Sequence, residues 1–263
     1  MLGKVLKYDL KWVYKVVVVF YILAFIFSVI GRALSAIENS VVFSVAAQIA
    51  FGFAISMMAS SLINCLMRLW ARFIRNLYKD ESYLTHTLPV PKKTIYASKV
   101  ISTLVCIFTT TVVIVSCLFI CYYSETNIEA LKSILELAAS TYNTTVVNLL
   151  LLISLVIFLQ IIFIVLIGYT GIILGYKSNK NKMVKTIVIG FALYMFTQAV
   201  SLGLILVFGL VNPNVMNLIN TTNVIDIDTI KSLMYASSGI YAVYIIFYYI
   251  FGKKQLEKGV NVE

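Results

Sequence analysis

The chain has 263 residues, of which 61% are hydrophobic and only 12% are charged, and its formal net charge is +10. A water-soluble domain of this length carries about twice that charged fraction, so the composition excludes an ordinary soluble protein. A pI of about 9.4 is also common among nucleic-acid-binding proteins. Here the basic residues follow membrane topology instead, and we expect no nucleic acid partner.

Six apolar runs are each long enough to cross the hydrocarbon core of a bilayer as a helix, which takes about 20 residues. Because the apolar residues run continuously and do not alternate with polar ones, they indicate helices and not the strands of a barrel. We predict an all-α integral membrane protein with a single transmembrane domain over residues 1–263. The predicted spans are 12–30, 41–66, 95–122, 146–175, 186–211 and 230–251.

Residues 1–11 precede the first span and have the pattern of an amphipathic helix lying in the membrane interface. One face carries basic residues at spacings of three, four and four: Lys4, Lys7, Lys11 and Lys15. The other face is mostly apolar, but Asp9 interrupts it. A buried carboxylate there needs a partner, for which the arginines after the second span are candidates. Alternatively, Asp9 reaches the headgroups. No small-residue cleavage site closes the first span, so we expect a retained helix and not a cleaved signal peptide.

The helical period continues beyond the second apolar run, through "LMRLWARFIRNLYK". Basic residues recur there at spacings of four, three and four: Arg68, Arg72, Arg75 and Lys79. The second helix is therefore predicted to extend past the membrane with one basic stripe. Such a stripe can bind lipid or phosphate, although it is more often a solvated face.

The segment "DESYLTHTLPVPKK", residues 80–93, separates the second and third spans. Asp80, Glu81 and Ser82 are typical of a helix start, because their oxygens cap free amides. Pro89 and Pro91 force an extended exit, so the third helix restarts near Lys92. The pattern predicts a short rigid helix with exposed apolar side chains, which indicates a protein contact.

Catalysis by this segment is not expected. Ser82, His86 and Asp80 have the residue types of a hydrolase triad, but catalytic partners normally converge from separate elements. No G-x-x-x-x-G-K-[ST] loop occurs in the chain, so it carries no phosphate-binding loop of its own. We predict a non-enzymatic subunit.

The third to sixth spans add few chemical signals. Residues 124–145 and 212–229 form the longest outer loops, the first with a predicted short helix at 128–139 and the second with an apolar "VMNLI" that can dip into the membrane. The four cysteines lie within spans and are expected to be small buried side chains without a metal. Small residues at helical spacing indicate helix packing or a transport pathway. They are Gly52, Ser56 and Ser60 in the second span and Gly168, Gly171 and Gly175 in the fourth.

The basic residues set the orientation. Both termini and the even-numbered connections hold all but three of the 21 lysines and arginines, the exceptions being Arg32, Lys132 and Lys231. The positive-inside rule then predicts that both termini are cytoplasmic. Part of this charge is expected to contact anionic lipid headgroups.

The leader "MLGKVLKYDLKW", the six spans and "DESYLTHTLPVPKKTIYASKVI" resemble the permeases of the type-2 ABC transporter family, many of which carry Asp-Glu, a "YLTxTLPV" stretch and one or two basic residues before the third span. The resemblance in topology covers the whole chain, whereas the resemblance in amino-acid sequence is limited to the segment after the second span. It implies that 1–11 is an elbow helix and that 80–91 is a coupling helix, which docks on a separate ATPase. The implied docking residues are Asp80, Glu81, Tyr83, Leu84, Thr87, Leu88 and Pro89.

The resemblance also implies two ATPase copies, which would bind ATP and Mg, and a second permease that is identical or homologous. It implies an exporter in the bacterial plasma membrane. Few polar residues lie within the spans, and none deep in a span after the first is charged, which indicates an amphipathic or hydrophobic cargo such as a peptide, a lipid-like molecule or a drug. Two alternatives stay open: a non-transport assembly or sensor subunit, and an ion-coupled secondary transporter, which the lack of intramembrane charge disfavours.

Overall fold

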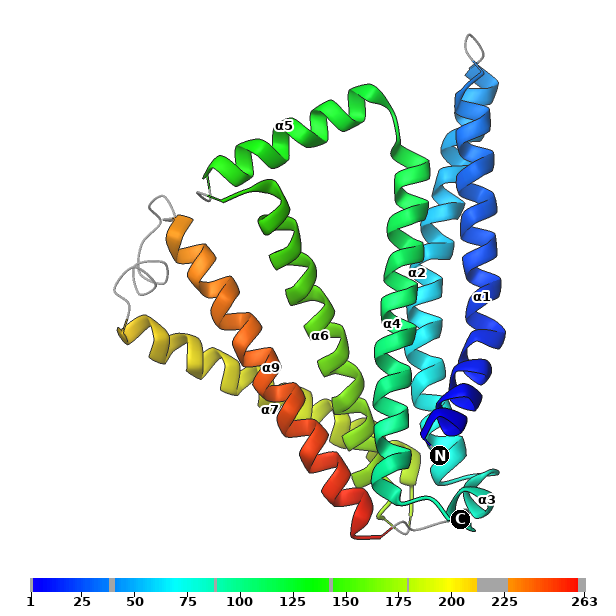
Figure 1. Ribbon diagram of the computed structural model, residues 1–263, viewed down its shortest axis with the longest axis vertical. Coiled ribbons are helices and arrows are strands. Elements are labelled where there is room, and N and C mark those ends of the chain that lie inside the picture. The colour runs from blue at the N-terminus through cyan, green and yellow to red at the C-terminus, as the bar shows by residue number, and fades with distance from the viewer. Residues whose placement is uncertain are drawn as a thin grey trace. The chain divides into compact units, whose positions relative to one another are not determined.

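The computed structural model describes residues 2–37, 41–87, 89–141, 144–178, 180–211 and 227–259, and within these ranges every regular element is a helix (Figure 1). The helices are α1 (Leu2–Ser35), α2 (Val41–Leu77), α3 (Ser82–Thr87), α4 (Lys92–Tyr122), α5 (Glu125–Thr141), α6 (Val146–Gly175), α7 (Lys182–Val211) and α9 (Ile227–Glu257). Six of them are long and apolar enough to cross a membrane: α1, α2, α4, α6, α7 and α9. The prediction of an all-α, multi-pass membrane protein is confirmed at this level.

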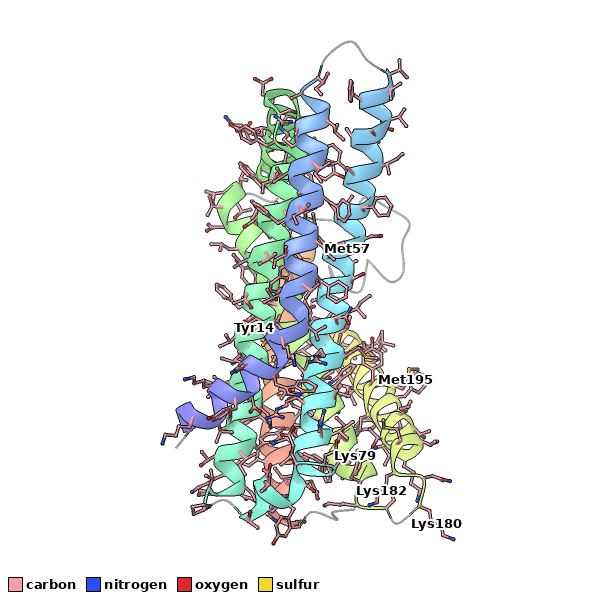
Figure 2. The ribbon with its side chains drawn as sticks, turned by 90° about the vertical axis from the view of Figure 1, so that its right-hand side faces the viewer. Tyr14, Met57, Lys79, Lys180, Lys182 and Met195 are labelled. Carbon is pink, nitrogen blue, oxygen red and sulfur yellow. The ribbon has the colours of Figure 1, made fainter. Side chains whose placement is uncertain are left out.

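The predicted leader and the first span form one continuous helix, α1. Figure 2 shows that the ribbon of α1 changes direction near Tyr14, so the first turns run at an angle to the rest. Residues 2–11 are therefore the beginning of α1. Their position in the membrane interface stays a prediction.

The basic region after the second apolar run continues α2 as far as Leu77, as its helical period predicts. The chain then turns, with the amides of Tyr78 and Lys79 both donating to the carbonyl of Ile74, at 2.9 and 3.2 Å. After α3, Pro91 takes an extended conformation with φ −56° and ψ 138° and precedes α4 directly. Proline is well tolerated at the start of a helix, because an N–H group there has no acceptor within the helix and its loss costs no hydrogen bond.

The chain divides into two compact units, Met1–Ala130 (unit 1) and Leu131–Asn261 (unit 2). In unit 1, α1 packs against α2 and α4, and the short α3 lies at the end of α2 (Figure 1). In unit 2, α6 packs against α7 and α9. The predicted outer helix at 128–139 is part of α5, whereas the "VMNLI" segment lies outside the described residues. The assignment of 1–263 to one functional domain stays a prediction.

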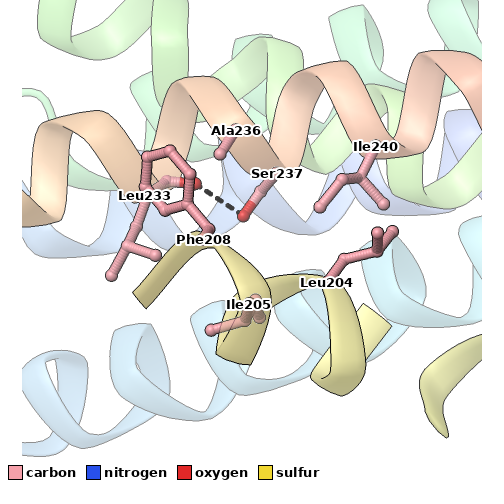
Figure 3. A pocket seen from close by; sticks show the side chains of 7 residues that line it. All are labelled: Leu204, Ile205, Phe208, Leu233, Ala236, Ser237 and Ile240. Atoms are coloured by element: carbon pink, nitrogen blue, oxygen red, sulfur yellow. Dashed lines mark hydrogen bonds between the residues drawn. The ribbon is translucent and has the colours of Figure 1, made fainter. Parts of the chain in front are cut away.

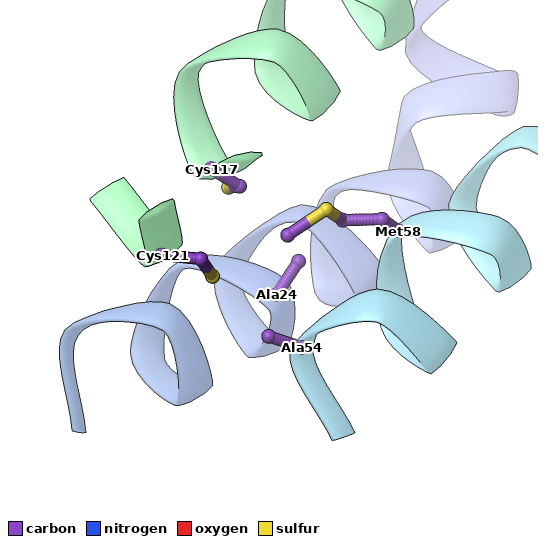
Figure 4. Packing of buried hydrophobic residues seen from close by; sticks show 5 residues of the cluster. All are labelled: Ala24, Ala54, Met58, Cys117 and Cys121. Carbon is purple, nitrogen blue, oxygen red and sulfur yellow. The ribbon is translucent and has the colours of Figure 1, made fainter. Parts of the chain in front are cut away.

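Small and sulfur-containing side chains form one buried cluster between the helices of unit 1. A cluster of Ala24, Ala54, Met58, Cys117 and Cys121 is fully buried (Figure 4). All four cysteines are buried and free, as expected for small apolar residues.

Two tyrosines of α1 add polar bonds to this packing. Tyr14 and Tyr21 make hydroxyl–hydroxyl bonds of 2.6 and 2.7 Å with Thr109 and Thr110 of α4, respectively. Two tyrosines that lie seven residues apart on α1 thus bond to two adjacent threonines of α4.

Two of the predicted small residues bring α6 and α7 of unit 2 into backbone contact. A Cβ added at Gly171 would lie 2.9 Å from the Cα of Gly190, and one added at Gly175 would lie 2.6 Å from the Cα of Thr186. Both glycines are buried. Only a residue without a side chain permits so close an approach.

The corresponding stripe on α2 behaves differently. No atom of its own unit lies within 4 Å of a Cβ added at Gly52, and Ser56 is exposed. Ser60, one turn further on, is half-buried, as is Gly168 on α6. The same spacing of small residues therefore accompanies a close helix contact in α6 but not in α2.

This contrast predicts opposite effects of one substitution at two sites. Gly175→Ala forces α7 away at Thr186 and should destabilise the protein by about 1–3 kcal/mol, the usual cost of overpacking. Gly52→Ala meets no neighbour in its unit and removes a glycine from a helix interior, which should stabilise by about 0.5–1 kcal/mol. Thermal unfolding of the two purified variants in the same detergent measures the difference, and equal shifts would contradict the observed packing.

Candidate functional site

Asp9 of α1 lies at the centre of a buried polar network in unit 1. Its side chain is 2% exposed, and its Oδ1 accepts hydrogen bonds from Arg72 Nε at 3.0 Å and from Lys99 Nζ at 2.6 Å. Its Oδ2 accepts from Ser98 Oγ at 3.2 Å. One carboxylate thus ties α1 to α2 and α4. Of the two alternatives for Asp9, pairing with an arginine after the second span is the one observed.

Lys99 is the member of this network that the sequence did not reveal. It lies one turn inside the predicted third span, where the positive-inside count places it on the cytoplasmic side, and its side chain is 1% exposed. An isolated ammonium group cannot be buried at low cost, so a lysine just inside a span calls for an acidic partner. Asp9 is the one acid on the apolar face of residues 1–11, and its presence there is the sequence feature that could indicate such a partner for Lys99.

Arg72 extends the network from Asp9 towards α3. Its Nη1 donates to Glu81 Oε2 in the turn before α3, while its Nε donates to Asp9, and its side chain is only 10% exposed. The guanidinium of Arg72 therefore holds two carboxylates that come from different parts of unit 1. With Lys99, these four groups carry two positive and two negative charges, which balance.

The predicted basic stripe on α2 is divided between two environments. Arg68 lies over the ring of Trp12, with its guanidinium carbon 3.9 Å from the ring centroid, and its Nη2 donates to the Trp12 carbonyl at 3.1 Å. Arg72 is buried, whereas Arg75 is exposed and contacts Asp80 at 3.2 Å. The middle residue of the stripe, Arg72, is therefore buried, whereas Arg75 and Lys79 at its C-terminal end are exposed.

The inner side of α3 is fixed to the end of α2 by side-chain hydrogen bonds. Asn76 Nδ2 donates to Thr85 Oγ1 at 2.9 Å and to Glu81 Oε2 at 3.3 Å. Thr85 Oγ1 in turn donates to the Glu81 carbonyl at 2.9 Å. His86 Nε2 lies 3.1 Å from the Leu77 carbonyl oxygen, which can only accept, so Nε2 carries the proton.

The outer side of α3 presents apolar and hydroxyl groups. Tyr83 is 76% exposed and Leu84 is 66% exposed, although both are large side chains. Thr87, Asp80 and Pro89 are also exposed. Of the predicted docking residues, Glu81 alone among those described turns inward, and Leu88 lies outside the described residues.

These residues form what we call the anchoring network: Asp9, Arg72, Asn76, Glu81, Thr85, Ser98 and Lys99. It joins α1, α2, α3 and α4 with hydrogen bonds, nearly all between side chains. It is built to hold an element in place, because each charge is neutralised and each carboxylate accepts more than one bond.

The residue types of a hydrolase triad in this segment are held apart by separate contacts. Ser82 is buried, His86 bonds to a backbone carbonyl and Asp80 contacts Arg75, so the three residues of a triad type do not act together. Among the described residues, no group of three or more His, Cys, Asp or Glu side chains is placed to hold a metal ion.

Unit 2 contains an apolar pocket of about 210 Å³ between α7 and α9 (Figure 3). Its one polar side chain, Ser237, donates its hydroxyl to the Leu233 carbonyl at 2.7 Å and so presents no free donor. The other lining residues are Leu204, Ile205, Phe208, Leu233, Ala236 and Ile240. Such a lining suits only an apolar group.

Breaking the anchoring network at one charge should cost more than removing a charge pair. Asp9→Leu leaves Lys99 buried without its carboxylate and should destabilise by about 3–5 kcal/mol. The double variant Asp9→Leu/Lys99→Met removes both charges and should recover part of that loss, since Arg72 keeps Glu81. SDS-induced unfolding of the purified chain measures both. Glu136→Leu, which breaks the exposed Lys132–Glu136 pair, is the control and should change stability little. A double variant less stable than Asp9→Leu would contradict the arrangement.

No protein-family model, curated protein or solved structure matches the chain. The anchoring network and the exposed side of α3 are therefore the candidate site on the strength of their own geometry.

Proposed function

We propose that the chain is the membrane-spanning permease subunit of an ATP-driven ABC exporter of the type-2 class, located in the bacterial plasma membrane with both termini cytoplasmic. The observation that supports this proposal most directly is the difference between the two sides of α3. Its inner side is bonded to the end of α2, while Tyr83 and Leu84 on its outer side are exposed. Exposed apolar side chains framed by charged residues are typical of a protein contact. The partner that fits is a soluble ATPase, which would bind ATP and Mg.

The position of α3 in the chain supports a role in transmitting force. It follows α2 through a four-residue turn and leads through Pro89 and Pro91 into α4. A displacement of α3 therefore acts on the ends of two spans at once. Two ATPase copies that close on ATP would move α3 in each of two permeases, identical or homologous, and rock the attached spans.

An apolar cargo fits the interior of the spans better than an ion. Asp9 accepts hydrogen bonds from both Lys99 and Arg72, so neither Asp9 nor Lys99 is an unpaired titratable group of the kind that ion-coupled carriers use. The pocket between α7 and α9 is lined almost entirely by apolar side chains. Both observations favour an amphipathic or hydrophobic cargo, such as a peptide, a lipid-like molecule or a drug.

Binding of an ATPase is the direct test. Leu84→Asp places a charge in the proposed contact and should abolish co-purification of a soluble ATPase from the native host, while insertion into the membrane stays normal. Leu131→Asp on α5, where the leucine is 57% exposed, is the matched control and should bind as the wild type does. Equal binding by both variants would refute docking through α3. If no ATPase binds the wild-type chain, an assembly or sensor subunit becomes the better explanation.

Membrane lipid is the second proposed partner, through the first turns of α1. Four lysines there are exposed, and none forms an ion pair with a described residue: Lys4, Lys7, Lys11 and Lys15. The one acid of this segment, Asp9, is turned inward and neutralised. The exposed surface is therefore purely cationic, which favours anionic headgroups.

Lipid preference should follow these lysines and not the total charge. Each contributes about 1 kcal/mol near an anionic surface, so changing all four to glutamine should remove most of the preference for phosphatidylglycerol over phosphatidylcholine. Native mass spectrometry of the purified chain counts the bound lipids. The control changes four other lysines of the predicted cytoplasmic side to glutamine: Lys177, Lys180, Lys182 and Lys185. An equal loss in both quadruple variants would assign the preference to net charge alone.

A further inference from the structure

Arg72 connects two parts of unit 1 that belong to different helices. Its Nε donates to Asp9 on α1, and its Nη1 donates to Glu81 in the turn that begins α3. The hydrogen bonds of Asp9 go to α2 and α4, so its route to α3 through side chains runs by way of Arg72. One guanidinium thus lies between the N-terminal segment and the proposed docking helix.

The geometry of this bridge requires an arginine. A guanidinium carries five N–H donors in a rigid plane and can hold two carboxylates at once, whereas a lysine ammonium is a compact point charge. Lys99 shares Asp9 with Arg72 from the α4 side, at 2.6 Å, and this leaves the charge of Arg72 available to Glu81. Because the side chains of Arg72 and Asp9 are 10% and 2% exposed, water screens the Asp9–Arg72 contact little.

We propose that Arg72 is a positioning residue that couples the N-terminal segment of α1 to α3, so that a displacement of either one reaches the other through its guanidinium. The identity of what docks on α3 rests on the proposed function, whereas the linkage is a property of this chain alone. Asp9 is buried and cannot touch a docked protein. Any effect of Asp9 on docking must therefore pass through its neighbours.

The linkage can be measured without any partner by the protection of a thiol on the inner side of α3. Ser82 is 4% exposed, so a Ser82→Cys chain should react with a maleimide only when α3 leaves the end of α2. The four native cysteines are buried and provide the background rate in the parent chain. The measurement uses the full-length chain in lipid nanodiscs, where both membrane faces are accessible.

Asp9→Asn should raise the labelling rate of this thiol about tenfold or more, which corresponds to the loss of a charged hydrogen bond. Glu81→Gln should do the same from the other end of the bridge. Because both substitutions break one linkage, the double variant should label about as fast as the faster single variant. In an Arg72→Gln background, Asp9→Asn should add nothing, whereas Glu81→Gln still removes the contacts of Glu81 with Asn76 and Arg75.

Two variants separate the geometry of Arg72 from its charge. Arg72→Lys keeps the charge but should restore protection only in part, because it cannot hold both carboxylates. Arg75→Gln, one turn along α2, removes contacts with Asp80 and Glu81 but none with Asp9, and should leave the thiol protected. Labelling as fast in Arg75→Gln as in Arg72→Gln would overturn the assignment to Arg72.

Further outcomes would also overturn the linkage. One is a thiol that stays protected in Asp9→Asn but reacts in Glu81→Gln. Another is a parallel rise in labelling of the buried Cys65, which would mean that Asp9→Asn loosens the whole unit. If Asp9→Asn does not insert, the comparison of Arg72→Gln with the parent chain remains, and equal labelling of these two chains would refute the bridge.

Adding the ATPase distinguishes this inference from the proposed function. Failure of any ATPase to bind the wild-type chain would refute the docking partner, while the thiol rates would still decide the linkage. If the ATPase binds, Asp9→Asn should weaken that binding although Asp9 is out of its reach. Unchanged binding together with unchanged thiol rates would refute the linkage and leave the docking assignment standing.

Discussion

Four charged side chains hold α1, α2 and α4 together at one end of unit 1, because the carboxylates of Asp9 and Glu81 balance the charges of Arg72 and Lys99. Asp9 is nearly inaccessible to water, and so is Lys99. Removing either from water costs several kcal/mol, about what a whole small domain gains on folding, unless a partner of opposite charge is fixed beside it. The three helices can thus adopt their packing only in a register that brings Asp9, Arg72 and Lys99 together. Such a network is better evidence of a defined arrangement than of extra stability.

The two sides of α3 follow from the same constraint. A helix of six residues has too few internal bonds to be stable in water by itself, since isolated helices shorter than about 12 residues are marginal. Asn76 of α2 supplies bonds from outside the helix, to Thr85 within α3 and to Glu81 in the turn before it. Because these contacts occupy one side only, Tyr83 and Leu84 are held in an exposed position that no local preference would maintain. The exposed positions of Tyr83 and Leu84 are therefore fixed by contacts within unit 1 itself.

Much of the fold follows from the sequence because membrane spans are defined by a local property. An apolar run of sufficient length specifies a helix without reference to the rest of the chain, and the predicted span 146–175 coincides with α6. The extension of α2 to Leu77 and the start of α4 at Lys92 were also accessible, because helical period and proline position are local signals.

What the sequence left open depends on how helices meet. The inward turn of Arg72 and the burial of Lys99 require the position of Asp9 on another helix, and no single-helix pattern contains that information. The small residues show the same limit: Gly52 and Gly175 belong to stripes of similar spacing, yet only Gly175 meets a backbone. For the predicted docking residues, the sequence pattern indicates a short helix but not that Glu81 turns inward. That division requires knowing which side of α3 faces Asn76.

The hydroxyl pairs between α1 and α4 restrict how these helices can move. Tyr14 and Tyr21 reach neighbouring threonines from two levels of α1, so sliding α1 in either direction along α4 stretches one pair or the other. Lipid tails offer a stranded hydroxyl no replacement. The two pairs therefore hold α1 and α4 in one longitudinal register.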